Sequence, residues 1–290
     1  MISSAQYAYR QSLHGRLPPE VYADEQVFVP AELECIGAGK TGAVYRIPND
    51  RVVKIFWRDA PAEKLHFLQE YAGASSLEHC AFPTALLRDV RGQVVGYRAR
   101  FMAGRPFLNN IFRESLTGSQ ISRWLQPLSA TLESLHADDI ALGDFANGNL
   151  LGGKAGLQIV DVDGWSLPGH RSVWHNQIVD PLYDSARQEG FEPANDVFAL
   201  AYILCRSLTK LSPYAGLYAG LSERERSLRG LSVFEPETIK PPGHTDLEDL
   251  LPKRVERYLQ AVCAHETRAL PDEYFWKELL SWSKARVNEA

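Results

Sequence analysis

The sequence predicts an α+β protein in which a small lobe, an antiparallel sheet with one helix, precedes a larger and mainly helical lobe. Three observations predict this fold. Short β-prone runs separated by glycine-rich or polar turns come first, apolar residues at helical spacing follow, and the pattern changes once, near residue 103. With 290 residues, 45% of them hydrophobic, the chain is long and apolar enough to form both lobes.

The predicted small lobe spans residues 31–102. Its strands are runs of β-branched and aromatic residues between turns. In chain order, these runs are residues 33–36, 43–47, 52–57, 85–89 and 94–102. Pro61 stands where the first residue of a helix belongs, so residues 62–74 are predicted to be helical.

The predicted large lobe spans residues 103–290. Its helices are segments in which apolar residues recur at helical spacing. In chain order, these segments are residues 121–136, 196–208, 254–265 and 273–287. Residues 1–30 contain three prolines, which interrupt regular structure, and show no helical or strand periodicity. They are therefore expected to form an irregular leader of unknown role.

Composition and charge exclude several classes of protein. The formal net charge is -5, so no global positive field would attract nucleic acid, and no nucleic-acid partner is expected. No run approaches the roughly 20 apolar residues of a membrane span, and residues 1–16 lack the apolar core of a signal peptide. The four cysteines, Cys35, Cys80, Cys205 and Cys263, show no disulfide or metal-ligand spacing, which fits a reducing compartment. We therefore expect a cytoplasmic protein without a membrane span.

A glycine-rich motif, G-x-G-x-x-G-x-V, lies between two predicted strands. The candidate binding residues in it are Gly37, Ala38, Gly39, Gly42 and Val44. Glycine lets a backbone approach phosphate oxygens closely, because it has no Cβ. A plain hairpin turn is the alternative. A Walker A loop is excluded, because that motif requires glycine where Glu34 stands and opens a helix rather than a strand.

Lys54 lies inside the apolar strand predicted at residues 52–57. Burying its ammonium group is costly unless the group meets an anion, so we predict that Lys54 binds phosphate. A solvent-facing lysine on an edge strand is the alternative. A carboxylate should hold the ammonium in place, and the predicted helix offers Glu63 and Glu70 on one face. The sequence does not decide between these two glutamates.

Two acidic segments follow in the large lobe. Asp144 and Asn149 form a D-x-x-x-x-N pattern, in which the carboxylate can accept a hydroxyl proton and the amide oxygen can ligate Mg²⁺. Asp161 continues an apolar strand and is the expected metal ligand beside Asn149, with Asp163 as a rival or second ligand. An acidic turn is the alternative for either segment taken alone. It does not account for the presence of both segments, in this order, after the glycine motif and Lys54.

These motifs, in this order, resemble those of the protein kinase superfamily, and in particular its divergent bacterial serine/threonine kinase-like branch (Hanks type). The resemblance covers about residues 31–290. It implies a bilobal protein-kinase-like fold, ATP with Mg²⁺ (or Mn²⁺) as cofactors, and a protein substrate or signalling partner. It also implies that the glycine motif covers the ATP phosphates, that Lys54 grips the α- and β-phosphates, and that Asp144 is the catalytic base. Asn149 and Asp161 would hold the metal.

Three further positions carry the resemblance. The segment from Met102 to Gly104 is similar to the hinge that hydrogen-bonds adenine. Asp196 resembles the buried aspartate that ties down the catalytic loop, and Arg268 resembles a structural arginine near the C-terminus. The family's A-P-E motif is not clear here. Two carboxylates therefore stay open as partners of Arg268, namely Asp184 and Glu189.

The chain also departs from the family's pattern. The H-R-D motif is Leu142-Gly143-Asp144, so the arginine that reads a phosphorylated activation loop is missing, and activity is expected without such phosphorylation. The lysine common two residues after the base is Ala146, which removes a positive charge near the transferred group. The glycine that ends D-F-G has become Asp163.

Several functions remain open at this point. The first is a phosphotransferase acting on protein serine or threonine hydroxyls. The alternatives are a pseudokinase scaffold that binds nucleotide without efficient transfer and a small-molecule kinase of the aminoglycoside or lipopolysaccharide type. Nucleotide transfer on the same fold is a further alternative. Labelling of acceptors with γ-labelled ATP separates the enzymes from the scaffold.

Overall fold

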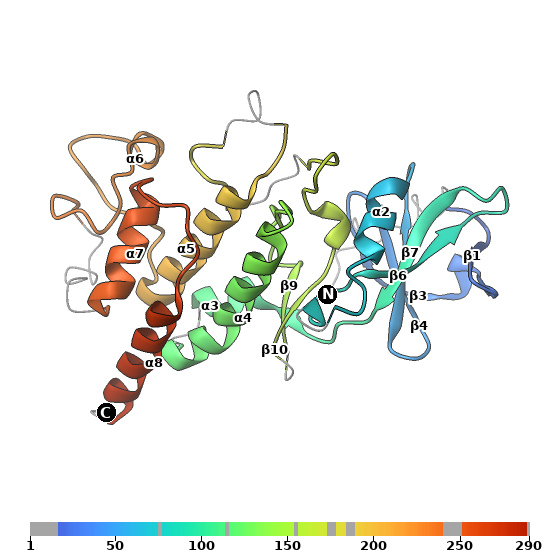
Figure 1. The fold of residues 1–290 in the computed structure, drawn as a ribbon, viewed down its shortest axis with the longest axis horizontal. Coiled ribbons are helices and arrows are strands. Elements are labelled where there is room, and N and C mark those ends of the chain that lie inside the picture. Colours follow the sequence, from blue (N-terminus) through green and yellow to red (C-terminus); the bar gives the residue numbers. More distant parts are fainter. Residues whose placement is uncertain are drawn as a thin grey trace, which may run out of the picture. The chain divides into compact units, whose positions relative to one another are not determined.

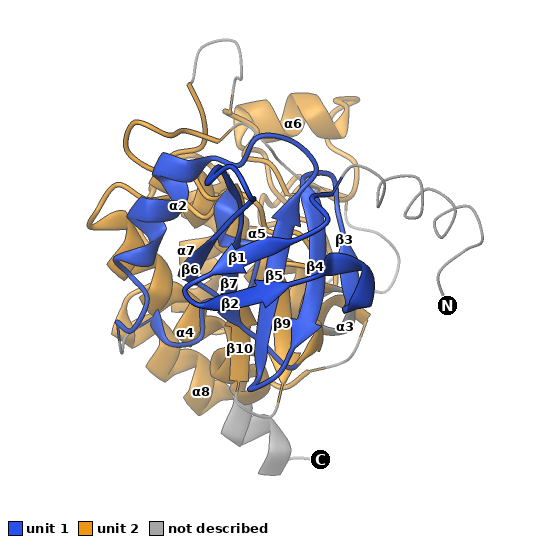
Figure 2. Cartoon of the chain, turned by 90° about the vertical axis from the view of Figure 1, so that its right-hand side faces the viewer, with its two compact units in different colours: residues 1–103, 160–163 blue, residues 104–159, 164–290 orange. Residues whose placement is uncertain are grey.

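A computed structural model describes residues 17–74, 77–113, 116–153, 156–172, 178–183, 189–239 and 251–288. This part of the chain is an α+β protein with seven α-helices and antiparallel sheets. It forms two compact units (Figure 2). Unit 1 contains the described residues up to Ala103 together with Val160–Asp163, and unit 2 contains Gly104–Ile159 and the described residues from Gly164 onward.

Unit 1 is built on one antiparallel sheet of seven strands, in the order β2-β1-β6-β7-β5-β4-β3. In chain order, the strands are β1 (Val21–Ala23), β2 (Gln26–Phe28), β3 (Glu34–Ala38), β4 (Gly42–Ile47), β5 (Arg51–Phe56), β6 (Pro83–Arg88) and β7 (Val94–Arg100). Helix α2 (Ala62–Gln69) packs against β6. The five strands predicted for this region are therefore present, with slightly different ends.

The side chains of β5 alternate between the two faces of this sheet. Val53 and Ile55 are fully buried in the hydrophobic core of unit 1. Lys54 lies between them and points to the other face. There the strand register places it beside Val44 on β4 and Tyr97 on β7. The register therefore assembles one row of side chains from three neighbouring strands.

Strands β1 and β2 correct the expectation that residues 1–30 are irregular. β1 pairs with β2 and with β6, and it buries Val21 and Ala23, while β2 buries Phe28. Each of these strands has only 3 residues, so neither is long enough to show a period of two in the sequence. Residues 1–16 of the predicted leader lie outside the described residues.

Helix α2 is shorter than the predicted helix at residues 62–74. After Gln69 the chain continues as turns, and Gly73 has a φ of 101°, which a right-handed helix does not contain. Glu70 is consequently the C-terminal cap residue of α2.

Unit 2 is mainly helical. Its helices are α3 (Phe107–Arg113), α4 (Gly118–His136), α5 (Pro193–Thr209), α6 (Glu223–Arg229), α7 (Lys253–Cys263) and α8 (Glu273–Asn288). A small antiparallel sheet has the order β10-β9-β8, with β8 (Arg105–Pro106), β9 (Leu150–Gly153) and β10 (Gly156–Ile159). α4 packs against α5 and α8, and α5 also packs against α7 (Figure 1). Helices α3 and α6 were not predicted, because each has only 7 residues and is too short to show a helical period.

Helix α4 illustrates how the sequence determines the helices of unit 2. Thr117 and Gln120 form a capping box at its start. Ile121, Leu125 and Leu128 lie on one stripe of the helix and are fully buried. None of the helices in the described part of the chain combines the length and the apolar character that crossing a lipid bilayer requires.

Candidate functional site

Lys54 forms the centre of a buried ionic cluster in unit 1. Its Nζ contacts Asp161 and lies 2.7 and 2.9 Å from the two carboxylate oxygens of Asp163. The hydroxyl of Tyr97 donates a hydrogen bond to Asp163 Oδ1 at 2.7 Å. The Asp163 side chain is 5% exposed, whereas the Asp161 side chain is 40% exposed. The two aspartates therefore differ: Asp163 is an internal partner, and Asp161 presents a carboxylate to solvent.

The protonation of this cluster follows from burial and from the close charges. Burial disfavours the charge on Lys54, but the carboxylates of Asp163 and Asp161 outweigh it and raise the pKa of the ammonium. Burial also disfavours the charge on Asp163, but Lys54 and the Tyr97 hydroxyl outweigh it and lower the pKa of that carboxyl. Burial, and then Asp163, raise the pKa of Tyr97 well above its ordinary value. Near neutral pH the cluster therefore contains an ammonium, a carboxylate and a neutral phenol.

Asp161 has an unusual backbone conformation. Its φ is 64°, in the left-handed region that aspartate visits more readily than most residues but still at some cost. The short 3₁₀ turn Val162–Gly164 follows directly. This conformation lets both Asp161 and Asp163 reach the same ammonium group, although they are two positions apart in the chain. Strained backbone of this kind is frequent at functional sites.

The pairing of Lys54 corrects the expectation that Glu63 or Glu70 holds its ammonium group. Glu63 lies in the first turn of α2 and Glu70 caps its end, and both residues are exposed. Asp163 takes the expected role instead. The sequence contains a signal for this, because Asp163 is the second of two carboxylates in an otherwise apolar run, but the signal does not distinguish a lysine partner from a metal ion.

Helix α2 contributes a second lysine, which the sequence analysis missed. Lys64 is 7% exposed, and within the described part of the chain no ion pair or hydrogen bond engages its amine. Burial lowers the pKa of Lys64 to about 8, and repulsion by Lys54 adds to this, although Asp163 and Asp161 oppose it. Lys64 therefore lies within electrostatic range of the Lys54 cluster without a direct partner in it.

The glycine motif forms the turn between β3 and β4. The N–H of Gly39 donates to the carbonyl of Gly42 at 2.9 Å, and the indole of Trp57 donates to the carbonyl of Gly39 at 3.0 Å. Gly37 pairs with Val44 in the sheet, and Val44 pairs with Lys54. Ala38 pairs with Ala43 at the end of β3. The motif is thus tied by register to the row that contains Lys54.

Gly39 and Gly42 have different roles, which a matched pair of variants should reveal. A Cβ at Gly42 would lie 2.3 Å from the carbonyl oxygen of Ile55, so we expect Gly42→Ala to lower the free energy of unfolding by about 1–3 kcal/mol. A Cβ at Gly39 would meet nothing within 4 Å, so we expect Gly39→Ala to change it by less than about 0.5 kcal/mol. Urea denaturation of both variants measures the difference. Equal losses would show that the turn, rather than the contact with Ile55, requires glycine.

The predicted hinge residues lie on either side of the boundary between the two units. Met102 is buried in unit 1. Gly104 belongs to unit 2, where an added Cβ would lie 2.9 Å from the Cβ of Leu151 and 3.1 Å from the carbonyl oxygen of Gly152. Packing against β9 therefore explains glycine at this position without a ligand.

Asp196 organises the loop before Asp144 in unit 2. Its side chain is fully buried, and its carboxylate accepts hydrogen bonds from the backbone N–H groups of Leu142 at 2.7 Å and Gly143 at 2.8 Å. The Nε2 of His136 lies 3.1 Å from the same carboxylate. These contacts confirm the expectation that Asp196 ties down this loop.

Asp144 and Asn149 are brought together by the same loop. The side-chain amide of Asn149 donates to Asp144 Oδ2 at 3.0 Å and to the Asp144 carbonyl at 3.3 Å. Both residues are half-buried. Gly143, which precedes Asp144, has a φ of 69°, and a Cβ on it would lie 2.7 Å from the ring of Phe191. The backbone therefore explains why glycine stands at this position.

Arg268 pairs with a carboxylate that the sequence analysis did not consider. Its Nη1 lies 2.7 Å from Oδ2 of Asp180, and Asp180 is buried. This pair corrects the choice between Asp184 and Glu189. Asp184 itself lies outside the described residues, and Glu189 is exposed.

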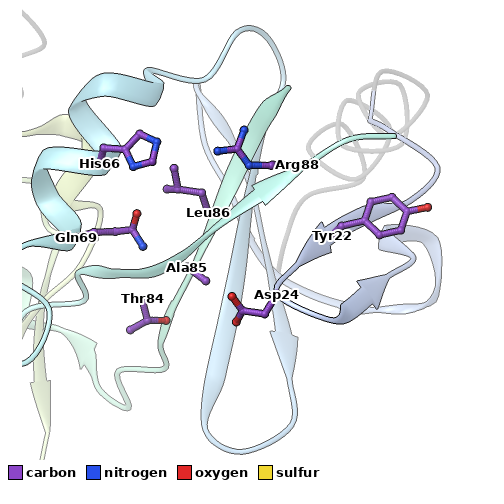
Figure 3. Close-up of a pocket in the computed structure, with 8 residues that line it drawn as sticks. All are labelled: Tyr22, Asp24, His66, Gln69, Thr84, Ala85, Leu86 and Arg88. Carbon is purple, nitrogen blue, oxygen red and sulfur yellow. The ribbon is translucent and has the colours of Figure 1, made fainter. Parts of the chain in front are cut away.

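A separate pocket of about 430 Å³ lies on unit 1 (Figure 3). Its lining comes from β1 and the turn after it, from α2 and from β6, and consists of Tyr22, Asp24, His66, Gln69, Thr84, Ala85, Leu86 and Arg88. In Figure 3, the side chains of His66 and Gln69 extend from α2 toward the strand that carries Thr84 and Leu86. None of the lining residues belongs to the Lys54 cluster.

The donor groups available to a metal ion are few. Within the described residues, no group of three or more histidine, cysteine, aspartate or glutamate side chains could hold a metal ion. Mg²⁺ bound together with nucleotide phosphates, however, needs only one or two protein oxygens. Asp161 offers an exposed carboxylate, and Asn149 has its amide nitrogen on Asp144 and its amide oxygen available. Asp163 has its oxygens on Lys54 and Tyr97, so within unit 1 Asp161 fits the ion better than Asp163 does.

These observations define an α+β protein with a buried lysine–aspartate cluster in one unit and an aspartate–asparagine loop in the other. We found no match to the chain among models of known protein families or among curated protein sequences. Its function is therefore argued from its own residues.

Proposed function

We propose that this protein is an ATP- and Mg²⁺-dependent phosphotransferase whose acceptor is a serine or threonine hydroxyl of a protein. The observation that carries the proposal is the contact between Lys54 and Asp161, which are 107 positions apart in the chain. An ammonium that can neutralise phosphate and an exposed carboxylate that can ligate a divalent ion are the two groups this chemistry needs close together.

Each chemical role in the proposal falls to a particular side chain. Asp144 accepts the proton of the attacking hydroxyl, and the hydrogen bond from Asn149 orients its carboxylate. Asp196 fixes the backbone that carries Asp144. Lys54 binds phosphate oxygens. Asp161 and Asn149 each offer an oxygen ligand that suits Mg²⁺, and the ion would supply neutralisation of the developing charge when it is bound.

In the structure Lys54 already has both aspartates as partners. Nucleotide must therefore compete with Asp161 for the ammonium, or share it. This full pairing of Lys54 favours a second candidate function, a pseudokinase scaffold in which the ionic cluster is structural and transfer is inefficient.

The Asp144→Asn variant tests the proposed reaction. We expect it to transfer label from γ-labelled ATP to protein acceptors at least about 100-fold more slowly than the parent, because a carboxamide cannot accept the hydroxyl proton. ATP affinity should stay unchanged. The matched control is Asp139→Asn, which removes a 55% exposed carboxylate from a surface ion pair and should transfer at the parental rate.

The same assay separates the candidate functions. A parent protein that binds ATP but labels no acceptor, with or without Mg²⁺, would support the scaffold and contradict the proposed transfer. Labelling of small hydroxylated molecules in preference to proteins would indicate a small-molecule kinase. Undiminished transfer by Asp144→Asn would remove Asp144 from its assigned role.

A further inference from the structure

We propose that Lys64 of α2 is a second phosphate-binding cation, which acts together with Lys54 on the polyphosphate group of a nucleotide. This inference rests on the proposed function and adds to it a binding residue that the motif pattern does not contain. It concerns unit 1 alone, because Lys54, Lys64, Asp161 and Asp163 all belong to that unit.

The first observation is that Lys64 is buried without a partner. It is 7% exposed, and no hydrogen bond or ion pair engages its amine within the described residues. A buried ammonium without a partner is costly, so such a group usually either is neutralised or meets an anion. Lys64 also lies in the first turn of α2, where the helix dipole disfavours a positive charge and favours an anion.

The second observation is that the nearby carboxylates are already engaged. Asp163 places its oxygens on Lys54 and Tyr97. Asp161 contacts Lys54 as well. Lys64 is attracted by both aspartates and repelled by Lys54, yet it forms an ion pair with neither aspartate. Both carboxylates are therefore placed on Lys54, so an incoming anion would pair with Lys64 without breaking an ion pair.

The third observation identifies the class of anion. The sheet register connects the glycine motif to Lys54 through Val44, so Gly37, Val44 and Lys54 form one row. A Cβ at Gly39 would meet nothing within 4 Å, so there is open space beside this residue. A lysine joined by register to such a turn, with a second lysine within electrostatic range of it, fits a ligand with several charged oxygens, as in a nucleoside diphosphate or triphosphate, better than a single carboxylate.

Titration calorimetry on the full-length protein tests the inference with three probes: ATP, inorganic triphosphate and adenosine. We expect Lys64→Met to weaken ATP and triphosphate binding by about tenfold, because one charge-assisted contact is lost. Adenosine affinity should stay unchanged, because adenosine has no phosphate. Lys64→Arg should retain most of the affinity for ATP. Lys277→Met, which removes a 63% exposed lysine from unit 2, should match the parent with all three probes.

Each outcome decides the inference. Parental ATP affinity in Lys64→Met, or an equal loss for ATP and adenosine, overturns it, because the first excludes a contact and the second indicates a general structural role. A parent that binds neither ATP nor triphosphate overturns the proposed function as well, so the two failures are distinguishable. If Lys64→Met does not fold, acetylation of Lys64 in the parent protein decides: triphosphate should slow it several-fold, and an unchanged rate contradicts the inference.

Discussion

Replacing Lys54 by methionine is expected to lower the free energy of unfolding by about 3–5 kcal/mol. The substitution keeps the aliphatic length of the side chain but removes the charge. It leaves the carboxylate of Asp163, whose side chain is 5% exposed, with the hydroxyl of Tyr97 as its one hydrogen-bond donor among the described residues. A buried carboxylate that loses its cation is among the most destabilising changes a protein core can undergo. Urea denaturation followed by circular dichroism measures the loss.

A double variant shows whether the lost pairing is the cause. Lys54→Met combined with Asp163→Asn removes both charges, so it should be more stable than Lys54→Met alone by at least about 1 kcal/mol. The coupling should be absent when Lys54→Met is combined with Asp139→Asn, which changes an exposed carboxylate in unit 2. If Lys54→Met unfolds at the parental urea concentration, the ionic cluster is not a stabilising element of unit 1.

Replacing Asp196 by alanine is expected to lower the free energy of unfolding by about 2–5 kcal/mol. The carboxylate is fully buried and accepts the backbone N–H groups of Leu142 and Gly143. Alanine would leave both donors buried without an acceptor, and each such donor costs about 1–3 kcal/mol. His136 would lose its partner as well. Thermal or urea unfolding of the full-length protein measures the loss.

Two comparisons make this prediction specific. Asp196→Asn keeps one carbonyl oxygen and should fall between the parent and Asp196→Ala. Asp139→Asn removes an exposed carboxylate that pairs with Arg171 and keeps a residue type that tolerates the φ of 55° at this position, so it should cost no more than about 1 kcal/mol. A loss for Asp196→Ala as small as that for Asp139→Asn would mean that water readily replaces the carboxylate at the loop.

The elements that the sequence predicted are those with a regular pattern of several turns or several alternations. Helix α4 buries Ile121, Leu125 and Leu128 on one stripe, so its period is visible in the sequence. Strands β1 and β2 have 3 residues each and are held by pairing with the rest of the sheet. Such pairing is a tertiary effect, and a local pattern does not contain it.

The candidate site also has residues that the sequence predicted and contacts that it did not. The residue types of the site, including Lys54, Asp144 and Asp161, are recognisable from their motifs. The partner of Lys54 is not recognisable in this way. Neither Glu63 nor Glu70 but Asp163 pairs with it, and this depends on where α2 ends and on the left-handed conformation of Asp161. Lys64 shows no pattern at all in the sequence. Lys64 is noticed only in the folded unit, where its side chain is buried.

The composition of unit 1 has a consequence for the order in which the protein can fold during its synthesis. Residues Val160–Asp163 belong to this unit although they follow its other described residues after a long interval of chain. A ribosome that has released residues up to Ala103 has therefore produced a sheet whose buried lysine still lacks both of its anions. Unit 1 therefore stays incomplete until the segment with Asp161 and Asp163 emerges. A fragment that ends at Ala103 would lack both carboxylates at all times.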